Sequence, residues 1–168
     1  MQLDHYSTIF NKQTFPVTVI CENVTNAPNI GSLFRTADAF GIEELIFCGE
    51  HIPLGRKMTK TSRATEKIVN FRQENDAIEV VSELKKNNYF VIALEITSKS
   101  EALVDFKFPK QKPIALLIGD ENFGVSEGVL KLCDTVIHIN MFGQNSSMNV
   151  VQATSVTLYE LTKQLKQS

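Results

Sequence analysis

Three polar segments of the chain carry the side chains that are best suited to chemistry. The first, 23–41, places several asparagines between an apolar run and a helical pattern, and it contains Arg35. The second, 119–124, follows the most apolar run of the chain and holds two acids between two glycines. The third, 139–150, is rich in asparagine and serine. Such amides, hydroxyls, carboxylates and a guanidinium can bind a ligand, orient a substrate or stabilise charge.

Arg35 is the residue whose position most strongly indicates chemistry. It lies between Phe34 and Ala37 in a largely apolar helical pattern, so its guanidinium must reach solvent, an acid or an anionic ligand. An ion pair with Asp38 or Glu22 is the structural alternative. The asparagines that precede Arg35 favour turns and helix caps by themselves, so the residues alone leave both roles open.

The other two segments also have plain structural explanations. Segment 119–124 lacks the Gly-x-Gly-x-x-Gly and Gly-Lys-Ser/Thr patterns of nucleotide-phosphate loops. Its two acids disfavour a phosphate but would tolerate a cationic or neutral ligand, and a strand-ending turn explains the segment equally well. The third segment reads as a flexible loop capped by Ser146 or Ser147, with Asn149 in the first turn of the helix that follows.

Strands and helices alternate around these segments. The expected strands are Phe15–Cys21, Glu44–Cys48, Lys67–Phe71, Tyr89–Leu94, a short one near Ala102–Val104, Ile114–Ile118 and Thr135–Ile139. The expected helices are Ile30–Phe40, Thr59–Thr65, Asp76–Asn87, Ser126–Cys133 and a final one from about Ser147 to Lys166. This order predicts an α/β fold with a mostly parallel sheet flanked by helices. Ligands of such sheets bind beyond the carboxyl ends of the strands, which is where the three polar segments fall.

Composition narrows the class of protein. The 168 residues carry 17 Lys and Arg against 19 Asp and Glu, which suits one domain over 1–168 and excludes a generally basic nucleic-acid binder. Neither a signal peptide nor an apolar run of about 20 residues is present. The three cysteines lack a Cys-x-x-Cys pair and the three histidines share no ligand spacing. We therefore expect a cytoplasmic protein with reduced thiols, without a membrane partner or a metal site.

Taken together, in this order and spacing, the three segments resemble the motifs of the SpoU/TrmH family of SPOUT methyltransferases. The resemblance covers about Val17 to Leu161. The matching positions are Asn29-Ile30-Gly31 and Arg35 to Gly41 in the first motif, Gly119, Glu121 and Gly124 in the second, and Ile139, Met141, Ser147, Asn149 and Val150 in the third. The chain departs from the family at Asn140, where proline is usual, and at Met148, where leucine is common.

The resemblance implies an S-adenosylmethionine-dependent methyltransferase that acts on a ribose 2′-hydroxyl of tRNA or rRNA. It also implies a C-terminal deep trefoil knot and a homodimer. The implied cofactor-binding residues are Leu94, Gly119, Glu121, Gly124, Ile139, Met141 and Met148. The implied catalytic residues are Arg35, Asn29, Glu121, Ser147 and Asn149. Since arginine keeps its proton up to a pKa above about 12, Arg35 is better suited to clamp a phosphate and stabilise a developing alkoxide than to act as a general base.

Although the chain as a whole is close to neutral, one stretch of the sequence is basic. It contains one acid, Glu66, and five basic residues, which are Arg56, Lys57, Lys60, Arg63 and Lys67. The stretch is either a solvated loop or a patch that contacts RNA phosphates. The length of the chain leaves no room for an added RNA-binding domain, which favours tRNA over rRNA. The alternatives are a non-catalytic RNA-binding or assembly protein on the same scaffold and an unrelated nucleotide enzyme.

Overall fold

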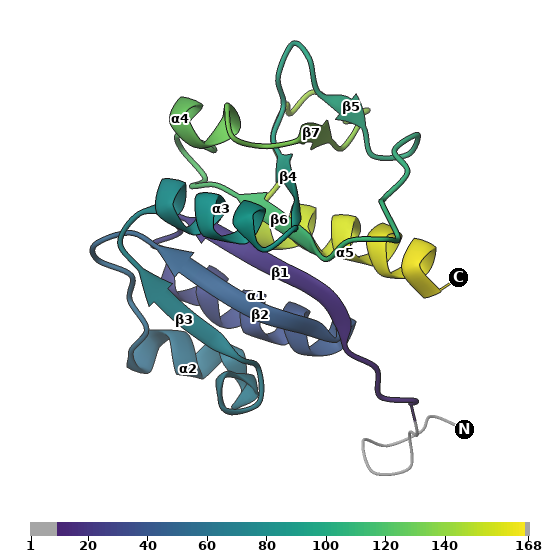
Figure 1. Ribbon diagram of the computed structural model, residues 1–168. Coiled ribbons are helices and arrows are strands. Elements are labelled where there is room, and N and C mark those ends of the chain that lie inside the picture. Colours follow the sequence, from purple (N-terminus) through teal and green to yellow (C-terminus); the bar gives the residue numbers. More distant parts are fainter. Residues whose placement is uncertain (1–9, 167–168) are drawn as a thin grey trace.

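A seven-stranded sheet forms the centre of the computed structural model, which describes residues 10–166 (Figure 1). Its strands are β1 Phe15–Glu22, β2 Ile42–Cys48, β3 Phe71–Glu74, β4 Phe90–Leu94, β5 Glu101–Ala102, β6 Ile114–Ile118 and β7 Thr135–His138. They lie in the order β3-β2-β1-β6-β4-β7-β5, and every pairing between these strands is parallel. The predicted parallel α/β sheet is therefore confirmed.

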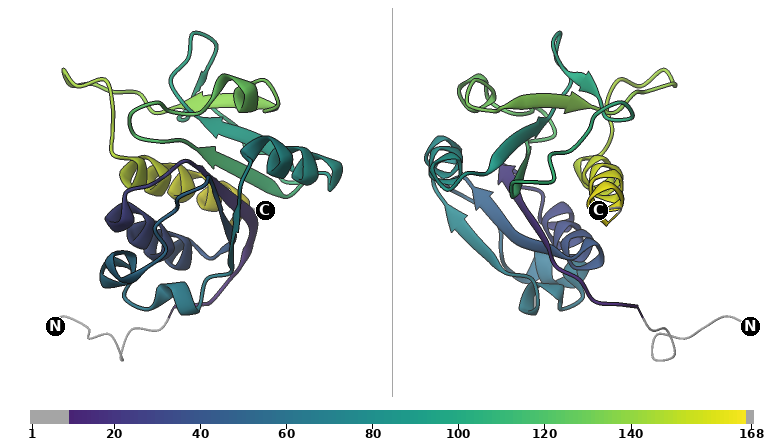
Figure 2. Two further views of the ribbon diagram at one scale, coloured as in Figure 1. Left: turned by 90° about the vertical axis from the view of Figure 1, so that its left-hand side faces the viewer. Right: turned by 45° about the vertical axis from the view of Figure 1, so that its right-hand side comes forward.

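Helices cover both faces of the sheet, as Figure 2 shows. They are α1 Ala27–Phe40, α2 Arg56–Ser62, α3 Ala77–Lys86, α4 Glu127–Leu130 and α5 Val150–Lys166. Buried side chains of α1, α2 and α5 pack into one core, and those of α3 and α4 pack into a second core on the opposite face. Strands that are buried on both faces read as continuous apolar runs, which is why β1 and β6 were predictable from the sequence.

Helix α1 positions the first polar segment. Its cap is Asn26, whose side chain accepts a hydrogen bond from the Asn29 N–H at 3.0 Å. Pro28 lies in the first turn, where its missing N–H costs nothing. The helix ends at Gly41, which adopts a left-handed conformation with φ 62°. The helix therefore begins three residues before the predicted start at Ile30.

The segment between β2 and β3 differs most from the prediction. Helix α2 begins at Arg56 rather than at residue 59, and it ends at Ser62 because Arg63 and Ala64 adopt positive φ angles of 51° and 68°. The predicted strand 67–71 is wrong, since Thr65–Lys67 forms a 3₁₀ turn (η1) that the Ile68 N–H closes onto the Thr65 carbonyl. The edge strand instead begins at Phe71.

The predicted start of α5 and the predicted end of α4 are also corrected. Helix α5 begins at Val150, because the Asn149 side chain is its cap and accepts the N–H groups of Val151 and Gln152 at 2.9 and 3.3 Å. Neither Ser146 nor Ser147 caps it. Helix α4 has Ser126 at its N-cap position, but it ends at Leu130 instead of Cys133. The Ser126 side chain donates to Glu22 and makes no capping hydrogen bond. Strand β5 begins one residue and ends two residues earlier than predicted.

The predicted thiols are present. Cys21 and Cys48 are buried and Cys133 is half-buried, and none of the three is in a disulfide. Burial raises the pKa of the Cys48 and Cys133 thiols to about 12, so both are poor nucleophiles. Within residues 10–166 no helix is both long and apolar enough to cross a membrane. The strand order does not test the knot, which stays a prediction.

Candidate active site

A cavity of about 500 Å³ opens beyond the carboxyl ends of β4, β6 and β7. It brings together the loops that follow these strands and the first turn of α5. All of the residues expected to bind the cofactor line it, namely Leu94, Gly119, Glu121, Gly124, Ile139, Met141 and Met148. The edge of the sheet predicted to bind ligands is therefore the edge that holds the cavity.

The loop after β6 is held by its own hydrogen bonds. The Asp120 carboxylate accepts the N–H groups of Asn122 and Phe123 at 2.8 and 3.0 Å, and the Gly124 N–H donates to the Asp120 carbonyl at 2.8 Å. A Cβ at Gly119 would overlap the Gly124 carbonyl. Glycine at 119 is therefore required for the loop to close on itself, a reason that the motif alone does not reveal.

Glu95 is a wall residue that the sequence interpretation did not nominate. Its carboxylate accepts the N–H groups of Val125 at 3.0 Å and Ile96 at 2.8 Å, and it lines the cavity. A Cβ at Gly124, whose φ is 66°, would overlap this carboxylate. An acid directly after the buried strand β4 was the available signal, but the motifs gave no reason to select it.

Three of the five expected catalytic residues form one hydrogen-bonded cluster, the Asn29–Glu121–Asn149 cluster. Both asparagine side chains donate to the same Glu121 oxygen, Asn149 at 3.1 Å and Asn29 through a short contact. Asn149 also donates to the Asn29 side-chain carbonyl at 3.3 Å. The cluster joins the first turn of α1, the loop after β6 and the cap of α5, which are the three segments singled out in the sequence.

Arg35 and Ser147 lie at different distances from the cavity. Ser147 lines it, and its hydroxyl lies 3.4 Å from the Asn145 side-chain oxygen. Arg35 is exposed on α1 and does not line the cavity, and its guanidinium has no hydrogen bond or ion pair within residues 10–166. Neither structural alternative for Arg35 is observed. Within the same residues no ion pair joins it to Asp38, and Glu22 instead accepts the Ser126 N–H and hydroxyl at 2.9 and 2.7 Å.

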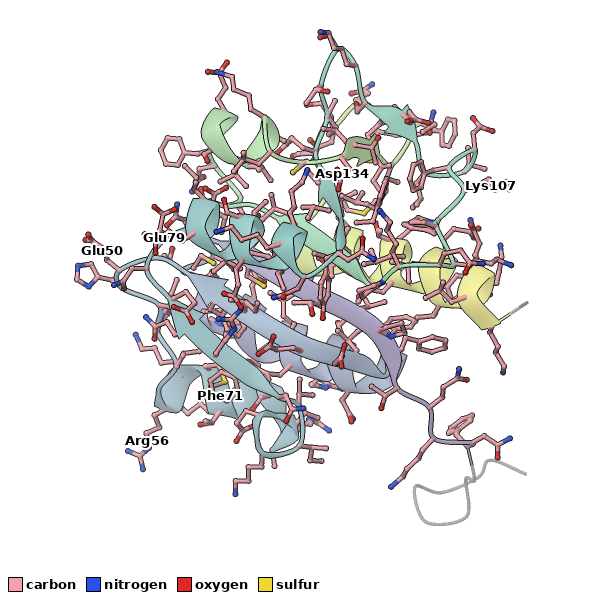
Figure 3. The ribbon with its side chains drawn as sticks, in the orientation of Figure 1. Glu50, Arg56, Phe71, Glu79, Lys107 and Asp134 are labelled. Carbon is pink, nitrogen blue, oxygen red and sulfur yellow. The ribbon has the colours of Figure 1, made fainter. Side chains whose placement is uncertain are left out.

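The basic stretch lies beside the start of α1. All five of its basic side chains are exposed, and Figure 3 shows Arg56 on the side of the molecule away from Lys107. The Thr61 hydroxyl donates to the Pro28 carbonyl at 3.2 Å, and a Cβ at Gly31 would overlap that hydroxyl and the Met58 carbonyl. Glycine at 31 therefore lets α2 pack closely against α1, two residues after Asn29.

Similarity to known proteins assigns the chain to a family. Residues 16–159 match the model of the SpoU rRNA Methylase family. The chain belongs to this family. It is 36% identical over 151 residues to the tRNA (guanosine(18)-2′-O)-methyltransferase of Thermus thermophilus, and the match covers 88% of this chain and 75% of that protein.

Solved structures of SpoU enzymes agree with this assignment. The A. aeolicus TrmH/SpoU tRNA modifying enzyme superposes with a TM-score of 0.84 at 26% identity, over 93% of this chain and 78% of that one. A second match is the SpoU methyltransferase AviRb from Streptomyces viridochromogenes in complex with the cofactor AdoMet. It superposes with a TM-score of 0.81 at 26% identity, over 94% of this chain and 63% of that one. The predictions of an RNA 2′-O-methyltransferase and of S-adenosylmethionine as its cofactor are confirmed.

The lining of the SpoU cavity fits S-adenosylmethionine, which supplies a methyl group on a positively charged sulfonium. Three carboxylates line the cavity, those of Glu95, Asp120 and Glu121, and its described lining includes neither lysine nor arginine. This charge suits a ligand with sulfonium and ammonium groups. The apolar side chains of Leu94 and Ile139 provide surface for an adenine ring.

Proposed function

We propose that this SpoU enzyme methylates a ribose 2′-hydroxyl of tRNA in preference to rRNA. The observation that carries the proposal is that Glu121 belongs both to the cofactor cavity and to the Asn29–Glu121–Asn149 cluster. A ribose held by this cluster lies next to the methyl donor. The preference for tRNA is supported by the relatives from Thermus thermophilus and A. aeolicus, whose names describe tRNA-modifying enzymes.

We assign Arg35 the role of a clamp on a phosphate next to the target ribose. Its guanidinium is exposed and has no carboxylate partner in the described part of the chain, so it is free to donate to phosphate oxygens in a bidentate way. The same positive charge would stabilise negative charge that develops on the 2′-oxygen. Asn29 and Asn149 offer amide groups that can orient the ribose, and Ser147 presents its hydroxyl at the cavity wall.

The proposed RNA surface extends from this site onto α2. Its basic residues, Arg56, Lys57, Lys60, Arg63 and Lys67, are exposed and adjoin the first turn of α1. The one acid of the stretch accepts the Ser62 hydroxyl, which lowers the pKa of Glu66. Lysine and arginine in this arrangement provide affinity for phosphates without base specificity.

We further propose that 1–168 acts as a single domain and assembles as a cytoplasmic homodimer. Helix α5 supports the dimer, since Val156 and Tyr159 are exposed on it at 44% and 62%. The single-domain proposal is supported by α5 packing against α1, where the Thr36 and Ser155 hydroxyls lie 3.2 Å apart. The three unpaired thiols suit a reducing compartment.

Methyl transfer from labelled S-adenosylmethionine to separated tRNA and rRNA tests the substrate. We expect label in tRNA and a nuclease-resistant ribose at the modified position. Label in rRNA alone would contradict the tRNA proposal. Binding of S-adenosylmethionine and RNA without transfer to either would favour the non-catalytic alternative.

A further inference from the structure

Two phenylalanine rings, carried by loops that contribute to the cavity wall, stand almost fully in solvent. Phe123 is 91% exposed and Phe142 is 96% exposed. Phe123 lines the cavity from the loop after β6, and Phe142 directly follows Met141, which lines it from the loop before α5. In the left panel of Figure 2 both loops lie on one side of the molecule, above the first turns of α5 and α1.

Other phenylalanine rings of the chain are buried in its core. Its other phenylalanines include Phe34 and Phe47, which are fully buried and pack with ring centroids 5.5 Å apart. Phe123, in contrast, sits on a backbone fixed by the Asp120 carboxylate, which accepts the N–H of Phe123 itself at 3.0 Å. A rigid backbone that presents an aromatic ring to solvent is suited to contacting another molecule at little entropic cost.

The surroundings indicate what that molecule is. The rings border a site that binds ribose under the proposed function, and the exposed cations of α2 adjoin the same site through the start of α1. Unpaired nucleobases carry flat, uncharged faces attached to anionic backbone, so they suit aromatic rings that stand near cations. A second copy of the chain would also cover the rings, but it gives no reason for their place at the rim of the cavity.

We propose that Phe123 and Phe142 are stacking contacts for unpaired nucleobases that flank the target ribose. The proposal rests on the proposed function, since it needs RNA at the cavity. It adds a requirement on the substrate: the bases next to the methylated ribose must be unstacked from their neighbours when the ribose enters. Because every base has a π-face, the contact tolerates different sequences.

The absence of tryptophan from the sequence makes a direct test available. Phe123→Trp and Phe142→Trp each create a protein with one tryptophan beside the cavity. Phe10→Trp is the matched control, because Phe10 is 83% exposed but precedes β1, at the opposite end of that strand from the cavity. Unmodified tRNA is titrated into each variant while tryptophan emission and RNA anisotropy are recorded together.

We expect saturable quenching at positions 123 and 142 that follows the anisotropy, and no quenching at position 10. RNA binding without quenching at positions 123 and 142 would overturn the proposal. A change in emission with protein concentration alone would assign the rings to a second copy of the chain, and a change at position 142 with S-adenosylmethionine alone would assign that ring to the cofactor. Both results would also overturn it.

Phe123→Ala and Phe142→Ala provide a second readout. Each should raise the KM for tRNA at least about fivefold, the scale of losing one base–aromatic stack. Phe142→Ala, at a residue outside the cavity lining, should also leave the affinity for S-adenosylmethionine unchanged. Phe123→Tyr should retain the wild-type KM. If the wild-type protein neither binds nor methylates RNA, the proposed function fails. If it does both and the alanine variants match it, only the stacking proposal fails.

Discussion

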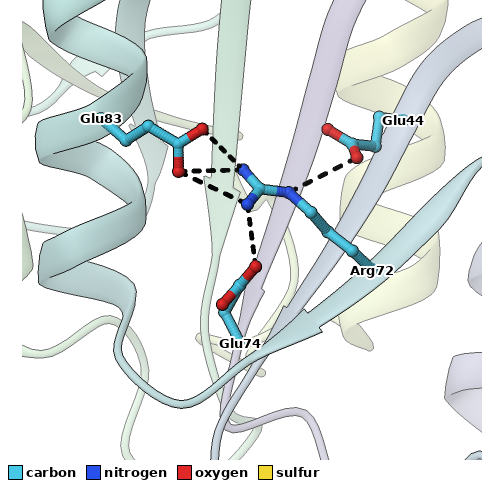
Figure 4. A network of polar contacts seen from close by, with 4 residues as sticks. All are labelled: Glu44, Arg72, Glu74 and Glu83. Atoms are coloured by element: carbon cyan, nitrogen blue, oxygen red, sulfur yellow. Dashed lines mark hydrogen bonds and ion pairs between the residues drawn. The ribbon is translucent and has the colours of Figure 1, made fainter.

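Arg72 and Arg35 show how the same side chain serves two regions of the molecule differently. Arg72 lies on the edge strand β3, where its guanidinium contacts Glu74 at 2.8 Å, Glu83 at 3.3 Å and Glu44 at 3.5 Å (Figure 4). Arg35 lies on α1 with no such partner in the described chain. The Arg72 guanidinium is paired with carboxylates of the fold and contributes to its stability. The Arg35 guanidinium has no such pair in that part of the chain and is available to a ligand.

The glutamates of the two regions also differ in whether their hydrogen-bond partners are charged. Burial raises the pKa of Glu44, although the Arg72 guanidinium acts in the opposite direction. Glu121, in contrast, is bound by the neutral amides of Asn29 and Asn149. Neutral donors fix the position of a carboxylate without cancelling its charge. The region around Arg72 connects elements of the fold, whereas we propose that Glu121 and Arg35 face cofactor and substrate.

Apart from Arg35→Ala, the variant with the largest expected effect on this contrast is Glu121→Ala. Removing the carboxylate leaves both cluster amides without their shared acceptor, so we expect turnover to fall about 10²-fold. Glu121→Gln keeps an acceptor oxygen and should lose less. Single-turnover methyl transfer at saturating S-adenosylmethionine measures the loss. Glu127→Ala, which removes an exposed acid of α4, is the control. An equal loss of turnover in that variant would show that Glu121 has no special role among the exposed acids.

Neutralising the basic stretch tests whether its exposed cations, like Arg35, bind phosphates of the RNA. Lys57→Gln, Lys60→Gln and Arg63→Gln together should weaken tRNA binding about tenfold and reduce the slope of log affinity against log salt by about 2–3. Lys107→Gln, Lys110→Gln and Lys112→Gln together remove the same charge elsewhere and serve as control. An unchanged slope in the first variant would identify the stretch as a solvated surface.

Arg72→Met should lower the stability of the fold and leave turnover unchanged, the opposite of what we expect for the variants of the site. Losing three partly exposed ion pairs should lower the free energy of unfolding by about 1–2 kcal/mol at low salt, because exposed pairs contribute about 0.2–1 kcal/mol each. Salt near 1 M should shrink the difference by screening. Turnover of the folded variant should equal that of the wild type. Urea unfolding at two salt concentrations measures the first effect, and a large loss of turnover would show that the Arg72 region is not purely structural.

The sheet was predictable because its central strands are continuous apolar runs with loops at their ends. The segment from Arg63 to Phe71 was not, since Arg63 and Ala64 take positive φ angles that neither residue type favours. Hydrogen bonds within the segment hold this turn, including that from the Thr65 hydroxyl to the Ser62 carbonyl at 2.6 Å, and β3 begins only after the apolar pair Ile68 and Val69. Local propensity cannot anticipate such a shift.

The site was predictable to the extent that its residues lie in ordered motifs. The motifs nominated Asn29, Glu121 and Asn149, and the structure joins them across 120 positions of sequence. They could not nominate Glu95, whose position at the cavity depends on which strand lies beside β6. The motifs also gave no structural reason for glycine at 119, where a Cβ would overlap the Gly124 backbone.

The turnover of folded Arg35→Ala tests the central claim most directly. With S-adenosylmethionine and tRNA both saturating, we expect turnover to fall about 10²–10³-fold, the effect of losing one directed electrostatic donor. The free energy of unfolding should change by less than about 0.5 kcal/mol, and Arg35→Lys should restore only part of the activity because it lacks the planar fork. Near-normal turnover in folded Arg35→Ala would contradict the claim that the open charge of this site serves the reaction.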